Sequence, residues 1–291
     1  MTGDGAFVEY RSLLFTIAYE IVGTVADAED VLQEAYLRWI HVDHAVVAHP
    51  RNYLAQIVTR QALNHLRTVR SRRENYVGTW LPEPVLTSSD AGADAILAES
   101  VSMAMMVVLE SLTPDERVVL VLHQVFGFAL TDIARFTGKT QAAVRQIAVR
   151  SRAHVQSRRR RYDPDPELAH QIVTRFLTSA KSGDLQALMD VLAPDVVQMS
   201  DGGGKVSAAR RPITGASTVA PFCAGVARKA PPLRARFGRF NDMPAAAFWH
   251  DEIAYQVVLF ELRNRRIHGI YAIRNPDKLR NIDRAHVLSR R

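Results

Sequence analysis

The sequence has very little cysteine and no long apolar run. Its 291 residues include a single cysteine, Cys223, so the chain cannot form an internal disulfide, which is typical of proteins from a reducing compartment. No stretch approaches the roughly 20 apolar residues of a membrane-spanning helix, and the N-terminal residues lack the pattern of a secretion signal. The ten histidines are not spaced as metal ligands. We therefore expect a cytoplasmic protein without a membrane segment, a metal or another cofactor.

Acidic residues are absent from two segments of the chain. Residues 51–73 contain six arginines and no acid, and residues 133–162 contain nine basic residues and no acid. Each follows an acidic segment, because residues 1–50 have a net charge of −6 and residues 74–132 have one of −8. Solvation alone is a poor explanation for such segregation. The pattern predicts contact with a polyanion at two separate places.

Apolar periodicity divides the chain into three globular parts. Residues 1–74 and 96–162 repeat apolar side chains at helical spacing, whereas residues 75–95 contain two prolines, two glycines and a Ser/Asp cluster, which is typical of a linker. Residues 165–291 mix helical and β-branched segments and predict an α+β domain. Within it, helices are expected over residues 167–182, 185–192 and 216–227, and strands over residues 196–200, 233–240, 246–250, 253–262 and 266–273.

The segment Leu130–Val149 has the spacing of a helix-turn-helix. Gly138 stands where a tight turn needs an unencumbered backbone, and Thr140 can cap the second helix. If Val144 and Ile147 pack against the first helix, the opposite face enters a DNA major groove. The outward residues would be Gln141, Ala142, Arg145, Gln146 and Val149.

Arginine reads guanine and glutamine reads adenine, so Gln141, Arg145 and Gln146 are candidates for base contacts. Arg150, Arg152 and the run 158–161 are better suited to phosphates, which give affinity without sequence information. The alternative is an ordinary two-helix corner with a solvated basic face.

The other basic segment combines arginines with nearby aromatic residues. Tyr36, Trp39 and Tyr53 are suited to stacking on unpaired bases of a melted strand, but their place on the apolar stripe favours the core of the bundle. The arginines are the firmer indication of nucleic-acid contact.

Two of these motifs resemble a known family. Asp27–Trp39 (DAEDVLQEAYLRW) resembles the core of sigma-factor region 2, and Leu130–Val149 resembles region 4. Their spacing is similar to that of the extracytoplasmic-function (ECF) class, which keeps only those two sigma domains. The resemblance implies a partner, core RNA polymerase with its β′ clamp and β flap, which the chain would direct to promoter DNA.

The resemblance also implies site residues. It assigns polymerase binding to Asp27, Asp30, Gln33 and Glu34. It assigns the −10 element to Arg60, Asn64, Arg67, Arg70, Arg72 and Arg73, and the −35 element to Thr140, Gln141, Ala142, Arg145, Gln146 and Arg150. Family members often have Asn and Asp where this chain has Arg60 and Asn64, so the family's base preference at −10 does not carry over.

Three further motifs resemble the ECF subgroup with a C-terminal SnoaL-like domain: WLPEP (Trp80–Pro84), DGGGK (Asp201–Lys205) and NPDKL (Asn275–Leu279). That resemblance implies an α+β domain with the cone-shaped NTF2-like fold over residues 165–291. We expect these motifs to hold it against the sigma domains or the linker. The residues expected at this regulatory interface are Trp80, Pro82, Asp201, Gly202, Gly203, Gly204, Lys205, Asn275, Pro276, Asp277 and Lys278.

Relatives of the SnoaL-like domain include small enzymes with a carboxylate in an apolar pocket, so a small-molecule ligand of this domain is one hypothesis. The aromatic residues that would line such a pocket, or fill the core instead, are Phe222, Phe237, Phe240, Trp249, Tyr255 and Tyr271. The carboxylates offer no paired arrangement, so no catalytic residue is expected, and Asp201 is interpreted as shaping a turn.

Two functions remain in competition at this point. The first is a promoter-specificity factor with a built-in regulatory domain. The second is a ligand-responsive DNA-binding regulator with an NTF2-like enzymatic or binding domain. The second function needs neither the helix Asp27–Trp39 nor the basic segment 51–73.

Overall fold

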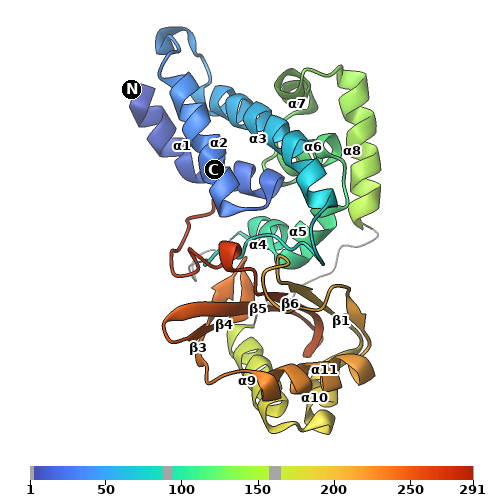
Figure 1. The fold of residues 1–291 in the computed structure, drawn as a ribbon. Helices are drawn as coiled ribbons and strands as arrows, with labels where there is room; N and C mark the ends of the chain where they lie inside the picture. The colour runs from blue at the N-terminus through green and yellow to red at the C-terminus, as the bar shows by residue number, and fades with distance from the viewer. Residues whose placement is uncertain (1–2, 88–93, 157–164, 291) are drawn as a thin grey trace.

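The computed structural model describes residues 3–87, 94–156 and 165–290, with the side chains of residues 3–4, 70–74 and 156 outside that description. A helical body, which we call the sigma body, comprises residues 3–74 and 95–156. A mixed α/β domain lies beneath it in Figure 1, and the chain's C-terminus returns to the sigma body.

The first half of the sigma body is a three-helix bundle, α1 (Gly3–Val22), α2 (Val25–Trp39) and α3 (Pro50–Glu74), with a short 3-10 turn η1 (His44–Val46). Thr24 caps α2 by accepting a hydrogen bond from the amide of Asp27 (3.2 Å). Trp39 is fully buried and packs against His44 and Tyr53, so the interpretation of this aromatic as core is confirmed. The same interpretation is wrong for Tyr36, which is 36% exposed on the outer side of α2, and Tyr53 is only partly buried.

The second half contains short helices. They are α4 (Ala95–Val101), α5 (Met103–Glu110), α6 (Pro114–Leu120), a π-helical turn η3 (Val121–Val125), α7 (Leu130–Thr137) and α8 (Gln141–Gln156). Thr113 and Glu116 form a reciprocal capping box at the start of α6, as the sequence Thr-Pro-Asp-Glu favours. One continuous apolar core runs through both halves, so α1–α3 and α6–α8 pack as a unit.

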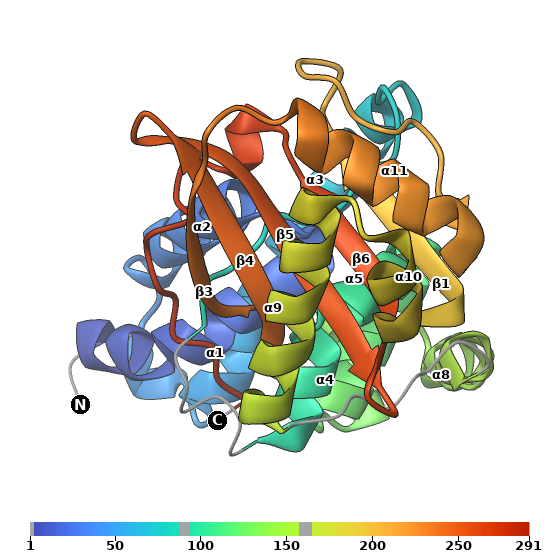
Figure 2. The same ribbon diagram turned by 90° about the horizontal axis from the view of Figure 1, so that it is seen from below.

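The C-terminal domain places three helices against one face of a curved sheet (Figure 2). The helices are α9 (Pro166–Ser182), α10 (Leu185–Val191) and α11 (Ala216–Lys229). The strands are β1 (Leu192–Asp201), β2 (Ile213–Thr214), β3 (Arg234–Phe240), β4 (Met243–His250), β5 (Ile253–Arg263) and β6 (Arg266–Ile273), in the order β2-β1-β6-β5-β4-β3. Only β1 and β6 pair in parallel among these strands.

The sheet is buried on both faces. In β5, Val258 and Phe260 point to the helices, whereas Val257 and Leu259 point to the opposite face. That opposite face packs against Leu81 of the linker and Met103 of α5, so the sheet lies between its own helices and the sigma body. A 3-10 turn η4 (Pro276–Lys278) follows β6 and lies at the same boundary.

The expected fold class is confirmed in both halves, and every expected element of the C-terminal domain is present with small differences at the ends. Three of its hairpins turn through two residues with positive φ, at 241–242, 251–252 and 264–265.

Within the described ranges, no helix is long and apolar enough to cross a membrane.

Candidate functional site

The outer face of α2 combines acidic and apolar side chains. Asp30, Gln33 and Glu34 are exposed, and Leu37, one turn further on, is 52% exposed. Positions three, four and seven apart share one face of a helix, so these four form a single surface. Leu37 was not predicted from the sequence, because a leucine in an amphipathic helix is more often a core residue.

Asp27 differs from the other three acidic or polar residues expected on this face. Its carboxylate accepts a hydrogen bond from Thr24 (2.6 Å) and pairs with His65 of α3 at 3.0 Å. Asp27 therefore fixes the start of α2 and contributes less to the open surface.

The helix-turn-helix has the geometry that its sequence predicted. Gly138 adopts a left-handed conformation with φ of 69°, and Thr140 accepts a hydrogen bond from the amide of Ala143 at 3.2 Å. Val144 and Ile147 are buried. The residues exposed along α8 and its cap are Thr140, Gln141, Ala142, Arg145, Gln146, Val149 and Arg150.

Two arginines in the described part of the basic face of α3 contact the second half of the sigma body. Arg60 donates to the backbone oxygens of Phe136 (3.1 Å) and Arg135 (3.0 Å), at the C-terminal end of α7, where the helix dipole favours a cation. Arg67 pairs with Asp115 of α6 at 3.0 Å. Asn64 remains exposed. Two of the residues expected at the −10 element thus contact α6 and α7 in this arrangement.

Some residues expected to bind DNA lie outside the described part of the chain. These are the side chains of Arg70, Arg72 and Arg73, and the arginines 158–161.

Asp201 is the centre of a buried cluster that joins the linker to the C-terminal domain. Its side chain is 0% exposed and accepts hydrogen bonds from Tyr76 (2.6 Å), the amide of Leu81 (2.9 Å) and Lys278 (2.8 Å). Burial raises the pKa of the Tyr76 hydroxyl, so it stays protonated and able to donate. We call Asp201, Tyr76, Leu81 and Lys278 the Asp201 cluster.

The interpretation of Asp201 as a turn residue was incomplete. Asp201 does accept a hydrogen bond from the amide of Gly203 (3.0 Å), and Gly203 and Gly204 have positive φ. Nevertheless, most of its bonds reach the linker and Lys278. Gly203 also packs so closely on Asn275 that a Cβ there would lie 2.4 Å from the Asn275 amide nitrogen. The motifs DGGGK and NPDKL therefore meet directly.

The lysine that reaches the linker is Lys278. It donates to the backbone oxygen of Leu81 and lies 4.0 Å from the ring centre of Trp80. Lys205, by contrast, forms an exposed ion pair with Asp277 at 2.5 Å. Pro82 is buried beside Leu81, and Pro276 opens the turn η4.

A second buried polar cluster, not expected from the sequence, is centred on Asn241 in the β3–β4 turn. Its side-chain amide donates to the hydroxyl of Tyr19 (2.6 Å) and the backbone oxygen of Val101 (2.9 Å). Its side-chain oxygen accepts from the amide of Val85 at 2.9 Å. Asn-Asp predicted a turn, but nothing in the local pattern indicated that α1, α4 and the linker would dock on it.

Glu83 in WLPEP connects the linker to α2. It accepts a hydrogen bond from the amide of Val25 at 2.8 Å, at the N-terminus of the helix that carries the acidic face. Burial raises the pKa of Glu83 to about 7. Glu83 was not among the residues expected at the regulatory interface, although the motif WLPEP contains it.

The C-terminal tail, residues 280–290, returns to the sigma body (Figure 1). His286 stacks on Phe15 of α1 with ring centres 4.8 Å apart, and the amide of Ser289 donates to Thr16 (2.9 Å). Arg290 pairs with Asp94 at 2.6 Å and donates to the backbone oxygen of Val125 (3.1 Å). The tail therefore contacts both halves of the sigma body.

The aromatic residues considered for a pocket in the C-terminal domain are distributed over several places. Phe240, Trp249 and Tyr271 are buried in the core between the sheet and the sigma body. Phe237 is 40% exposed, and Phe222 and Tyr255 are partly exposed. No group of three or more His, Cys, Asp or Glu side chains is placed to hold a metal among the residues that the structure describes.

Comparison with known proteins identifies the family of the chain and agrees with its fold. The family model for sigma-70 region 2 matches residues 6–73, and the model for sigma-70 region 4 matches residues 102–155. The ECF RNA polymerase sigma factor SigJ of Mycobacterium tuberculosis is 36% identical over 286 residues, which cover 94% of this chain and 91% of SigJ. The crystal structure of SigJ superposes with a TM-score of 0.76 at 35% identity, covering 94% of this chain and 97% of the other.

The similarity to SigJ includes the C-terminal domain as well as the two sigma regions, and the region 2 match contains the helix that a simple DNA-binding regulator would not need. The chain therefore belongs to the family of extracytoplasmic-function RNA polymerase sigma factors.

Proposed function

We propose that this chain binds core RNA polymerase through the outer face of α2 and directs it to promoters read by α8. The observation that supports this most is the presence in one chain of two exposed surfaces of different chemistry. One is the acidic and apolar face of Asp30, Gln33, Glu34 and Leu37, and the other is the face of α8 with Arg145. The first suits a basic protein partner such as the β′ clamp, and the second suits DNA. Region 4 would also contact the β flap.

The first test concerns α2. Asp30→Lys and Glu34→Lys are each expected to weaken binding to core polymerase at least tenfold, about 1.4 kcal/mol, because like charges then meet across the interface. Both side chains are exposed, so the fold should be unaffected. Glu9→Lys makes the same charge change at an exposed position of α1 and serves as the control. Co-purification and fluorescence anisotropy measure the affinity, and parental affinity in both α2 variants would refute the assignment.

The second test concerns base reading by α8. Arg145→Ala is expected to remove the preference for one base of the −35 element, at a cost of about 1–3 kcal/mol for the preferred site. Arg150→Ala, which we assign to a phosphate, should weaken binding to all sequences alike and lower its salt dependence. Selection of binding sites from a random DNA pool distinguishes the two. An unchanged base preference for Arg145→Ala contradicts the assignment.

We further propose that the packed arrangement is not the promoter-bound one. The −10 and −35 elements lie about 25 base pairs apart, or roughly 85 Å along B-DNA. A compact chain of this length has a radius of gyration of only about 19 Å. Furthermore, Arg60 and Arg67, which are expected at the −10 element, already contact α7 and α6 in the packed chain. Regions 2 and 4 must therefore separate before both elements are bound.

This leads to a regulatory role for the C-terminal domain. The Asp201 cluster, Asn241 and the C-terminal tail each join parts of the chain that would move apart on opening. A domain that favours the packed state over the open one lowers the population able to bind polymerase. We propose that it acts as a regulator within the chain, without a catalytic role.

A further inference from the structure

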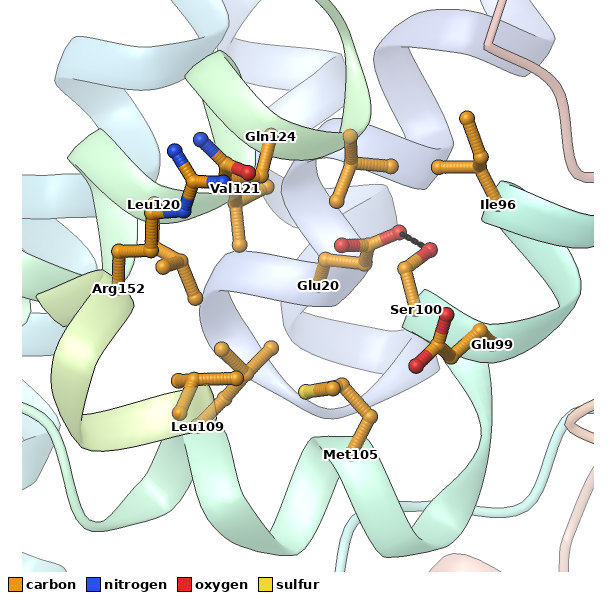
Figure 3. A pocket seen from close by; sticks show the side chains of 12 residues that line it. Glu20, Ile96, Glu99, Ser100, Met105, Leu109, Leu120, Val121, Gln124 and Arg152 are labelled. Carbon is orange, nitrogen blue, oxygen red and sulfur yellow. Dashed lines mark hydrogen bonds between the residues drawn. The ribbon is translucent and has the colours of Figure 1, made fainter. Parts of the chain in front are cut away.

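A cavity of about 230 Å³ lies inside the sigma body, apart from the surfaces described above. Its walls come from α1, α4, α5, the α6–η3 segment and α8, so both halves of the sigma body line it (Figure 3). The walls are mainly apolar and include Met105, Leu109 and Leu120. A ligand that fills it must be smaller than the drug-sized molecules held by cavities of about 300–1,000 Å³.

Glu20 of α1 is the most deeply buried of the polar residues in these walls, which also include Glu99, Ser100, Gln124 and Arg152. Its side chain is 0% exposed and points into the cavity (Figure 3). Oε1 lies 2.8 Å from the hydroxyl of Ser100, whereas Oε2 has no hydrogen-bond partner within the described part of the chain. Arg117 donates to the backbone oxygen of Glu20 and pairs with the carboxylate of Glu110. Burial raises the pKa of Glu20 to about 8, so this carboxyl group is costly to ionise without an added positive charge.

The protonation state of Glu20 and its contact with Ser100 together determine which partner Oε2 needs. Ser100 Oγ carries one proton and lies 2.9 Å from the backbone oxygen of Leu97 as well as 2.8 Å from Oε1 of Glu20. When Glu20 is ionised, both of its oxygens are acceptors. When Glu20 is protonated on Oε1, it donates to Ser100, which donates to Leu97, and Oε2 is again an acceptor. When Glu20 is instead protonated on Oε2, Ser100 donates to Oε1 and Oε2 is itself a donor. A cationic ligand favours the ionised state, in which both carboxylate oxygens accept hydrogen bonds.

We propose that this cavity binds a small amphipathic amine, whose ammonium group donates to Oε2 of Glu20 and whose apolar part contacts Met105 and Leu109. A cation supplies the charge that allows Glu20 to ionise, and it makes the stronger, charge-assisted hydrogen bond. The carboxylate of Glu99 also lines the cavity and adds negative potential. Arg152 lines the side away from Glu20 in Figure 3.

Such a ligand would stabilise the packed sigma body. It contacts α1 of region 2 together with α8 of region 4, and this combined site exists only while the two regions are packed. A ligand that binds only one state shifts the equilibrium toward it. Binding of the amine to the free chain does not depend on the proposed function. The expected effect of the amine on polymerase binding does rest on that function.

The test uses the full chain and three probes of equal chain length: hexylamine, hexanol and hexanoate. Saturating hexylamine is expected to raise the melting temperature by roughly 5 °C. Hexanol should give a smaller rise, and hexanoate should give none. Equal shifts with all three probes would overturn the proposal, because binding would then not depend on the ammonium group. No shift and no heat of binding with hexylamine would also overturn it and leave a cavity that holds water only.

Two variants make the test specific. Glu20→Gln keeps the size of the side chain and removes its charge, and it should lower the affinity for hexylamine at least tenfold. Ile96 lines the cavity and is 44% exposed, so Ile96→Trp should close the entrance with little effect on the core. If Glu20→Gln fails to fold, Ile96→Trp decides alone. Parental affinity in Ile96→Trp overturns the site, whereas a chain that binds hexylamine but not core polymerase overturns the proposed function only.

Discussion

Lys278→Met is expected to destabilise the folded chain by about 3–5 kcal/mol, because it leaves the buried charge of Asp201 without its cation. The ammonium lies 2.8 Å from the Asp201 carboxylate, and the two side chains are 7% and 0% exposed. Tyr76 and the amide of Leu81 still donate to Asp201, but neither carries a positive charge. Urea unfolding followed by tryptophan fluorescence measures the loss, since Trp80 lies directly beside Lys278.

Lys205→Met is the matched control, because Lys205 is the neighbouring lysine in an ion pair that is exposed. Its pair with Asp277 should contribute only about 0–1 kcal/mol. Combining Lys278→Met with Asp201→Asn removes both buried charges and should recover much of the lost stability. Equal losses for Lys278→Met and Lys205→Met would show that the buried pair does not hold the linker.

Removal of residues 285–291 is expected to increase the affinity for core polymerase at least tenfold and to increase the radius of gyration. The deletion removes the stacking on Phe15, the bond to Thr16 and the Arg290 contacts with Asp94 and Val125. When fewer contacts favour the packed state, the fraction able to bind polymerase rises, and the apparent affinity rises with it. Small-angle scattering and anisotropy measure the two effects.

Val287→Ser is the control for this deletion. Val287 is 70% exposed and lies in the same tail, so its replacement should leave both the compaction and the affinity unchanged. A truncated chain with parental scattering and parental affinity for polymerase would contradict the regulatory role of the tail.

Local chemistry explains what was predictable from the sequence. Thr113 and Glu116 form the expected cap, and Gly138 has the expected left-handed backbone, because such signals act over a few residues. The strands of the C-terminal domain were predictable for a similar reason, since β-branched and aromatic runs between turn residues have few other structures available.

The docking of distant segments was not predictable in the same way. Lys205 and Lys278 stand in equally polar, turn-forming motifs, and only the packed structure makes one exposed and the other buried. The hydrogen bond from Arg60 to the end of α7 similarly depends on how the two helical units pack against each other. The spacing of apolar residues within one helix does not predict that packing. Residue spacing thus predicted which residues of α8 are exposed, but not the contacts that Arg60 and Arg67 make with α7 and α6.

The most direct test of the proposed mechanism measures the separation of regions 2 and 4. Fluorophores at Val8 of α1 and Ala153 of α8, both exposed, report it by energy transfer. Cys223 is replaced by serine, although burial raises its thiol pKa to about 12 and would slow its labelling. The mechanism predicts high transfer in the free chain and a separation larger by tens of ångströms when core polymerase and promoter DNA are bound. Unchanged transfer in a complex that initiates transcription would contradict it.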